Sequence, residues 1–288
     1  MSIKKYHIGT TQWGLKEWVG SFYREDARPD QFLRQYASVF NSVEGNTTFY
    51  RVPSPETIRQ WGDAVPDGFK FCFKFPQTVT HYKRLNDVED EVIRFIDLFS
   101  PIHEKTGPFH IQLAPSFSYK EFGKLEKMLN LLPAEHHYAV EVRHLDYFDK
   151  GKQERHLDQL LKSLNMDRVI FDSRKLFSLQ PHAPAIREAQ KKKPKVPIRF
   201  DTTGMRPFVR YVGANDILNN ETYLKEWAII TADWIREGLH PYIFIHAPEK
   251  RHAPPLVRHF HRELSKLIDL NPMPAFPSER QDEQLGLF

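Results

Sequence analysis

Cysteine is almost absent from this sequence, because Cys72 is the only one among 288 residues. A single cysteine cannot form an internal disulfide, and it excludes a zinc site built from cysteines. Long apolar runs are absent as well, since no stretch approaches the roughly 20 residues of a membrane span. The first residues lack the apolar segment of a secretory signal. We therefore expect a cytoplasmic protein with no membrane partner.

Several motifs of known chemistry are also missing. No Gly-x-Gly-x-x-Gly follows a predicted strand, which argues against a dinucleotide-binding sheet. No serine or cysteine lies in a nucleophile-elbow motif. The one His-x-His pair, His259 and His261, falls in the predicted last helix, where residues two apart point in different directions. We accordingly predict no cofactor.

The bulk composition is that of an ordinary soluble globular protein. Hydrophobic residues make up 40% and charged residues 27%, and the formal net charge is +4. A mildly basic chain suits an anionic ligand or nucleic acid, but many proteins that bind neither have the same charge balance.

Strand-like and helix-like segments alternate about eight times along the chain. The clearest strand is Phe69 to Phe75, where four phenylalanines face one way and Lys70, Cys72 and Lys74 the other. Pro29 and Ser54 are typical of helix starts. Such alternation predicts an α/β protein with a slightly irregular TIM-like (β/α)8 barrel over residues 1–270. The predicted strands lie near residues 6–10, 40–46, 69–75, 109–113, 138–143, 169–172, 208–212 and 242–246.

The longest segment without a clear pattern lies between Asp172 and the seventh strand. It contains the basic run 190–195, Gln-Lys-Lys-Lys-Pro-Lys. A run of this kind is typical of a solvated loop, and contact with a phosphate backbone is the alternative.

Polar or ionisable side chains lie near the carboxyl ends of seven of the eight predicted strands. In a barrel these ends meet at one rim, where active sites are built. The densest stretch runs from Phe40 to Arg51 and contributes residues beyond the strand end itself. The rim candidates are Glu44, Asn46, Thr48, Tyr50, Arg51, Lys74, His81, Gln112, Glu141, Arg143, Asp172, Arg210 and His246.

The candidates divide by chemistry into four groups. Glu44, Glu141 and Asp172 are the acid/base candidates, although they could equally hold the neighbouring cations in place. Three cations at one mouth suit a phosphate or carboxylate ligand, and they make a divalent metal the less favoured alternative. The phosphate-binding candidates are Lys74, Arg143 and Arg210. The residues that would orient or contact the substrate are Asn46, Thr48, Tyr50, Arg51, His81, Gln112 and His246. The residues that could stack on a base or sugar are Trp13 and Tyr23.

Several of these motifs together resemble the YecE-like family, also called domain of unknown function 72. The likeness covers roughly residues 6–270 and implies a TIM-barrel-like fold without pointing to one reaction. Some members resemble the barrel of apurinic endonucleases, whose metal ligands are not matched here, and His246-Ala247 stands where many members carry Asn-Asn. The motifs are the loop with Trp13, Trp18, Phe22 and Tyr23, the stretch Val43 to Pro53, the pairs Phe73-Lys74 and Thr80-His81, the segment Gln112 to Phe117, and Glu141-x-Arg143-His144.

The composition changes after residue 270. Residues 271–283 are rich in proline and then polar, which predicts a flexible linker. The final five residues, 284–288, resemble the bacterial sliding-clamp-binding peptide Gln-Leu-x-Leu-Phe. Gln284 would supply hydrogen bonds, while Leu285, Leu287 and Phe288 would fill an apolar groove. The alternative is that this tail folds back onto the barrel.

The first hypothesis is therefore an enzyme, of hydrolase or phosphodiesterase type, acting on a phosphorylated or nucleic-acid substrate. The tail would link it to the sliding clamp and to DNA repair or maintenance. Two alternatives stay open: a non-catalytic module that binds an anion or nucleic acid, and a small-metabolite enzyme unrelated to DNA.

Overall fold

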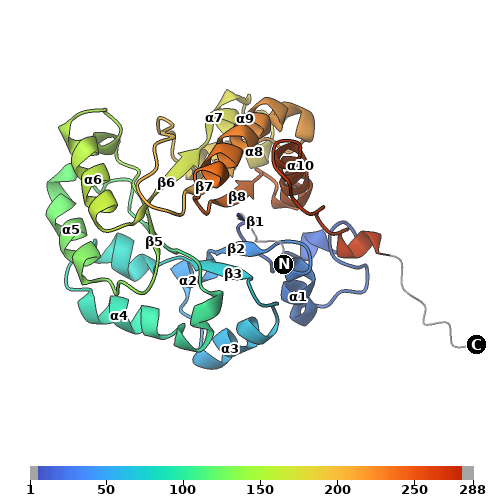
Figure 1. The fold of residues 1–288 in the computed structure, drawn as a ribbon, viewed down its shortest axis with the longest axis horizontal. Helices are drawn as coiled ribbons and strands as arrows, with labels where there is room; N and C mark the ends of the chain where they lie inside the picture. The colour runs from blue at the N-terminus through green and yellow to red at the C-terminus, as the bar shows by residue number, and fades with distance from the viewer. Residues whose placement is uncertain (1–5, 281–288) are drawn as a thin grey trace, which may run out of the picture.

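The computed structural model describes residues 6–280, and all strands within them run parallel to their neighbours (Figure 1). Six strands form one sheet in the order β1-β8-β7-β6-β5-β4, and β2 pairs with β3 in a second. The α/β class and the parallel sheet are thereby confirmed. The strands are β1 (His7–Gly9), β2 (Ser42–Gly45), β3 (Lys70–Phe73), β4 (Phe109–Gln112), β5 (Tyr138–Glu141), β6 (Asp167–Asp172), β7 (Phe208–Val212) and β8 (Tyr242–His246).

The regular ladders are interrupted at two seams, so they do not form one continuous eight-stranded sheet. At the seam between β1 and β2, the Glu44 amide donates to the Thr10 carbonyl over 3.0 Å. At the seam between β3 and β4, the Phe75 amide donates to the His110 carbonyl over 2.9 Å. At the same seam, the Gly107 amide donates to the Phe71 carbonyl over 2.8 Å, so isolated hydrogen bonds link the two sheets where regular ladders are missing.

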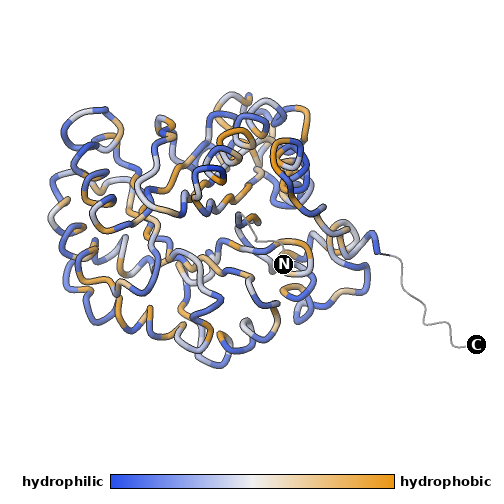
Figure 2. The backbone as a smooth tube through the Cα atoms, in the orientation of Figure 1, coloured by the Kyte–Doolittle hydropathy of each residue, from blue (hydrophilic) through white to orange (hydrophobic). Residues whose placement is uncertain are grey.

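Helices cover the outside of the strands (Figure 1). Hydrophilic and hydrophobic residues alternate along these helices, as expected for elements with one face toward a core (Figure 2). Ser54 accepts a hydrogen bond from the Thr57 amide at the start of α3, so the predicted N-cap is present. The helices are α1 (Phe32–Ala37), α2 (Thr47–Tyr50), α3 (Pro55–Asp63), α4 (Glu89–Asp97), α5 (Phe122–Leu131), α6 (Lys152–Ser163), α7 (Arg174–Ser178), α8 (Pro184–Lys192), α9 (Ile217–Arg236) and α10 (Ala253–Ser265).

The phenylalanines of the third strand pack into the helix-side core, as their alternation predicts. Phe73 stacks on Phe99 with ring centroids 4.0 Å apart, and Phe75 meets Phe95 at 5.3 Å. Lys74 therefore points to the opposite, interior side, where it is almost completely buried. Among residues 6–280, no helix combines the length and hydropathy that crossing a membrane requires.

Two segments differ from the sequence expectations. The segment after Asp172 is not wholly irregular, because it forms α7 and α8 before the extended residues that lead to β7. Residues 271–280, expected to be a linker, contact the fold: Phe276 is buried and its ring lies 4.9 Å from that of Phe22. The clamp-binding peptide predicted at residues 284–288 lies outside the described residues.

Candidate functional site

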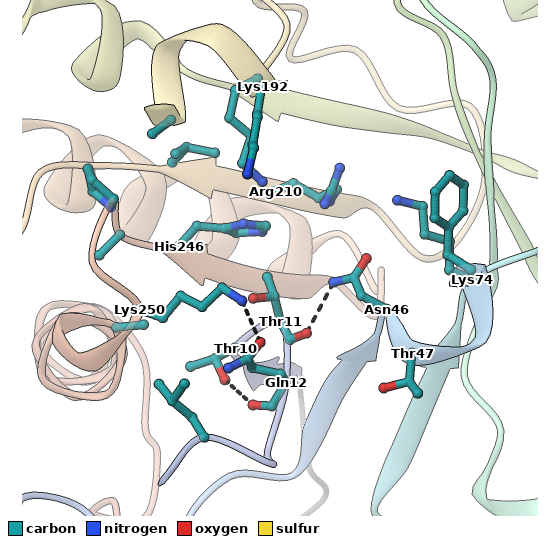
Figure 3. Close-up of a pocket in the computed structure, with 18 of the residues that line it drawn as sticks. Thr10, Thr11, Gln12, Asn46, Thr47, Lys74, Lys192, Arg210, His246 and Lys250 are labelled. Atoms are coloured by element: carbon teal, nitrogen blue, oxygen red, sulfur yellow. Dashed lines mark hydrogen bonds between the residues drawn. The ribbon is translucent and has the colours of Figure 1, made fainter. Parts of the chain in front are cut away.

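An open cavity of about 1550 Å³ lies at the carboxyl ends of the strands. Figure 3 shows side chains around it, with Lys192 on the opposite side from Gln12 and Lys250. Strands β4, β7 and β8 supply Gln112, Arg210 and His246, and Lys74 directly follows β3, so several of the polar residues predicted for one rim line one space. Other predicted residues in its lining are Asn46, Tyr50, Arg51, His81 and Arg143.

Arg210 is the centre of the cavity floor. Its Nε lies 2.8 Å from Glu44 Oε2, and its Nη2 lies 2.7 Å from Glu44 Oε1, which makes a bidentate pair. Its Nη1 lies 2.5 Å from Glu141 Oε2. All three side chains are buried. One guanidinium from β7 thus joins carboxylates from β2 and β5.

A second chain of contacts leads from Glu141 toward the open cavity. Arg143 Nε lies 2.6 Å from Glu141 Oε1, and Arg143 Nη2 lies 2.6 Å from Gln112 Oε1. The same Gln112 oxygen accepts a 2.5 Å hydrogen bond from Lys74 Nζ. Neither glutamate is among the residues lining the cavity, whereas Arg143, Lys74 and Gln112 all are. The carboxylates therefore lie behind a layer of cations.

The two glutamates are held ionised despite their burial. Burial by itself would raise the pKa of Glu44, but the charge of Arg210 holds that pKa well below its usual range. Burial likewise opposes ionisation of Glu141, and Arg143 and Arg210 lower its pKa well below the usual range. At neutral pH both residues are anions that neutralise neighbouring guanidinium groups.

The histidines of the floor are neutral at pH 7. His110 Nε2 lies 3.1 Å from Glu141 Oε2, and burial lowers the His110 pKa to about 4. His246 Nε2 lies 3.4 Å from Glu44 Oε2, and burial together with Lys193 lowers its pKa to about 3. Burial also lowers the pKa of His81 to about 4. Because none carries charge, the lysines and arginines set the sign of the cavity's potential.

The stretch from Phe40 to Arg51 turns sharply at the rim. Asn46 lies past the end of β2, yet its Nδ2 donates to Glu44 Oε1 over 2.8 Å and to the Thr11 carbonyl over 3.1 Å. Thr48 is buried and donates to the Lys74 carbonyl over 2.6 Å. Its hydroxyl fixes the short helix α2 against β3, and Thr48 does not line the cavity.

Two exposed tyrosines lie at the cavity mouth. Tyr50, at the end of α2, is 73% exposed, and Tyr82 is 70% exposed. Tyr82 ends a π-helical turn, Thr78–Tyr82, which also brings His81 to the cavity. Single π-helical turns occur frequently at functional sites.

Besides Glu44, Glu141 and Thr48, three predicted site residues are absent from the cavity lining: Asp172, Tyr23 and Trp13. Asp172 is buried and accepts hydrogen bonds from Arg174 and from Trp227 Nε1, the latter over 2.8 Å. Tyr23 is fully buried, with its hydroxyl donating to the Trp13 carbonyl. The Trp13 ring packs edge-on against Trp61, 5.2 Å between centroids. Tyr23 therefore belongs to the core beneath the first loop, and the partly buried Trp13 packs against that core.

The cavity also contains residues that sequence reasoning did not single out as site residues. Lys192 and Lys193 lie at the end of α8, Lys250 follows β8, and Gln12 belongs to the first loop. The basic run was the available signal for the two lysines. Lys250 Nζ and Gln12 Oε1 lie 2.8 Å apart although 238 residues separate them, which no local pattern could indicate.

Comparison with known proteins places the chain in a family. The model "Protein of unknown function DUF72" matches residues 7–280. The chain belongs to the DUF72 family. UPF0759 protein YecE of Escherichia coli K12 is 37% identical over 274 residues, covering 95% of this chain and 98% of that protein. The predicted resemblance is confirmed, and the DUF72 match extends past the expected boundary at residue 270.

Crystal structures of DUF72 proteins support the same fold. One from Thermotoga maritima has a TM-score of 0.71 and 25% identity, covering 90% of this chain and 99% of its own. One from Enterococcus faecalis V583 has a TM-score of 0.68 and 15% identity, covering 94% and 98%. Within residues 6–280, no three His, Cys, Asp or Glu side chains are grouped as metal ligands would be.

Proposed function

We propose that the cavity binds a phosphorylated ligand and that the protein is an enzyme acting on a phosphorylated or nucleic-acid substrate. The observation that carries this proposal is the charge of the floor. Lys74, Arg143 and Arg210 outnumber the two carboxylates, Glu44 and Glu141, and the cations lie on the open side. An anion entering the cavity therefore meets donors first.

Free donors remain for such a ligand. Lys74 Nζ uses one hydrogen bond on Gln112, and it lies 4.4 Å from the centroid of the Phe49 ring. Within the described chain, Arg143 Nη1 has no hydrogen-bond acceptor. Burial, followed by the charge of Arg210, lowers the Lys74 pKa well below its usual range. A bound phosphate would offset both effects and favour the ammonium form.

The cavity's size and mouth support an extended substrate. Its volume exceeds the roughly 300–1,000 Å³ of ordinary small-ligand pockets. The exposed rings of Tyr50 and Tyr82 at the mouth can stack on bases or sugars. These features favour a nucleotide or the end of a nucleic acid as the ligand. The alternative ligand is a small metabolite unrelated to DNA.

We also propose that the eight strands act as a closed TIM-like barrel. The hydrogen bonds from Glu44 to Thr10 and from Phe75 to His110 support closure at the two seams. The Arg210 contacts support it too, because they join β2 to β5 and β7 through the interior.

The direct test is to measure, by isothermal titration calorimetry, how tightly the protein binds inorganic phosphate and short damaged DNA duplexes. Lys74→Met should weaken both at least tenfold, whereas Lys225→Met, on an exposed face of α9, should change neither. Equal affinity in all three proteins would refute the anion pocket. Phosphate release or strand cleavage would show an enzyme, and salt-dependent binding without turnover would support the non-catalytic module instead.

The link to DNA repair rests on the tail sequence alone. Gln284, Leu285, Leu287 and Phe288 match the clamp-binding pattern, and we propose that they bind the bacterial sliding clamp. Immobilised clamp should retain the full chain and lose it after Leu287→Ala with Phe288→Ala. Equal retention of both proteins would refute clamp binding by the tail and would leave the proposal for the cavity unchanged.

A further inference from the structure

Lys193 differs from the other lysines of the cavity because its amine has no partner. It is the C-cap residue that follows α8, it lines the cavity, and it is partly exposed. Lys74 donates to Gln112, Lys250 to Gln12, and Lys192 pairs with Glu188. Across residues 6–280, no hydrogen-bond acceptor or carboxylate is paired with the Lys193 amine.

Ionisable groups from four strands lie near this amine. Arg210 comes from β7, Glu44 from β2, Glu141 and the nearby Arg143 from β5, and His246 from β8. The two carboxylates are already neutralised by the two guanidinium groups. The amine therefore faces fixed positive charge without an anion of its own.

This environment favours the neutral amine. Surrounding protein first, and the charge of Arg210 second, lower the Lys193 pKa to about 7. At neutral pH the neutral fraction is roughly 10³-fold larger than for an ordinary lysine. A neutral amine is a nucleophile, and lysines next to another cation serve this way in covalent catalysis.

We propose that Lys193 is a nucleophile that forms an imine with the carbonyl carbon of a substrate carrying a phosphate or carboxylate group. The inference rests on the proposed function, because the floor cations would hold the anionic group while the carbonyl meets Lys193. The amine lone pair adds to the carbonyl carbon, and one amine proton moves to the carbonyl oxygen. The resulting hydroxyl leaves with the second amine proton as water while the C=N bond forms.

The neighbouring lysines do not suit this role. Lys74 is buried under Phe49 and donates to Gln112, so its amine is held in place and is not presented to an incoming carbonyl group. Lys192 is exposed and paired with Glu188, so it serves as a matched control one residue away. If Lys193 were only an ionic contact for the anion, arginine would replace it without loss of function.

Pyridoxal 5′-phosphate is a suitable probe because it carries an aldehyde and a phosphate in one small molecule. The full-length protein is incubated with it, reduced with borohydride and digested, and the modified lysines are quantified by peptide mass spectrometry. We expect the first equivalent on Lys193, at least tenfold faster than on Lys192, with a rate that rises as pH increases through about 7. Inorganic phosphate should slow the labelling.

Variants separate this inference from the anion pocket. Lys193→Arg should abolish the fast labelling while leaving phosphate affinity within about threefold, and Lys225→Arg, on the exposed face of α9, should leave both unchanged. Labelling spread evenly over surface lysines, or fast labelling that survives Lys193→Arg, would overturn the nucleophile even if phosphate still binds. Absence of phosphate binding to the unmodified protein would instead overturn the pocket on which the inference rests.

Discussion

Replacing Arg210 by methionine tests the charge network most directly. Methionine keeps most of the side-chain volume but leaves Glu44 and Glu141 buried without their shared guanidinium. Removing one partner of a buried ion pair costs about 3–5 kcal/mol, which in a chain of this size lowers Tm by on the order of 10 °C. Arg236→Met is the matched control, because that arginine pairs with Asp233 on an exposed face, and it should cost less than about 1 kcal/mol.

The pH dependence of the unfolding free energy tests the same ion pairs. In the unmodified protein the folded-state pKa of both glutamates is lowered, so their stabilisation is present above their unfolded pKa and is lost as pH falls through the folded one. Without Arg210, burial raises the pKa of Glu44, and protonation then relieves the unpaired charge. The difference in unfolding free energy between variant and parent should therefore shrink from pH 7 to pH 5.5.

Urea unfolding followed by fluorescence measures these differences, and a second substitution isolates the pair. Adding Glu44→Gln to Arg210→Met should recover about 1–3 kcal/mol relative to the sum of the two single variants. Strict additivity, or a loss for Arg210→Met no larger than for Arg236→Met, would refute the assignment of Arg210 as the link between β2, β5 and β7.

Three further outcomes follow from other parts of the molecule. Gly9→Ala should destabilise the protein by at least about 2 kcal/mol in urea unfolding, because a Cβ there would lie 1.9 Å from the Ser42 carbonyl oxygen. Phe276→Ala should cost about 3–5 kcal/mol in the same assay, since this ring is buried against Phe22; no change would mean that residues 271–280 are a linker. Sulfate should bind more weakly as pH rises from 6 to 8, because Lys193, with a pKa of about 7, loses its charge while the charge of sulfate stays constant. In calorimetry of Lys193→Met, the affinity for sulfate should not change over this pH range.

The sequence was informative wherever a local period determined the structure. Strict alternation in residues 69–75 predicted both the packing of Phe73 and the inward direction of Lys74, because side chains of a strand alternate between its two faces. The same period placed Gln112 and His246 at strand ends, where the structure has them, whereas Arg210, predicted near a strand end, lies in the middle of β7. The clustering of these residues then followed from the parallel arrangement of the strands.

Local patterns failed where the outcome depends on tertiary contacts. Asp172 ends β6 as predicted, but Arg174 and Trp227 bind its carboxylate away from the cavity. Trp13 and Tyr23 could have formed a stacking surface or a core, and only burial distinguishes the two. Lys193 carries no special pattern, because its position depends on how α8 meets the ends of the sheet.

The seam between β1 and β2 has a mechanical consequence. The β2–β3 pair is not joined to its neighbours by regular ladders, yet Glu44 on β2 accepts hydrogen bonds from both Nε and Nη2 of Arg210. The ion pair at the floor of the cavity therefore also links the two sheets. A ligand that drew Arg210 away from Glu44 would loosen the contact between the β2–β3 pair and the other sheet. The free energy lost at that contact would then be subtracted from the free energy of ligand binding.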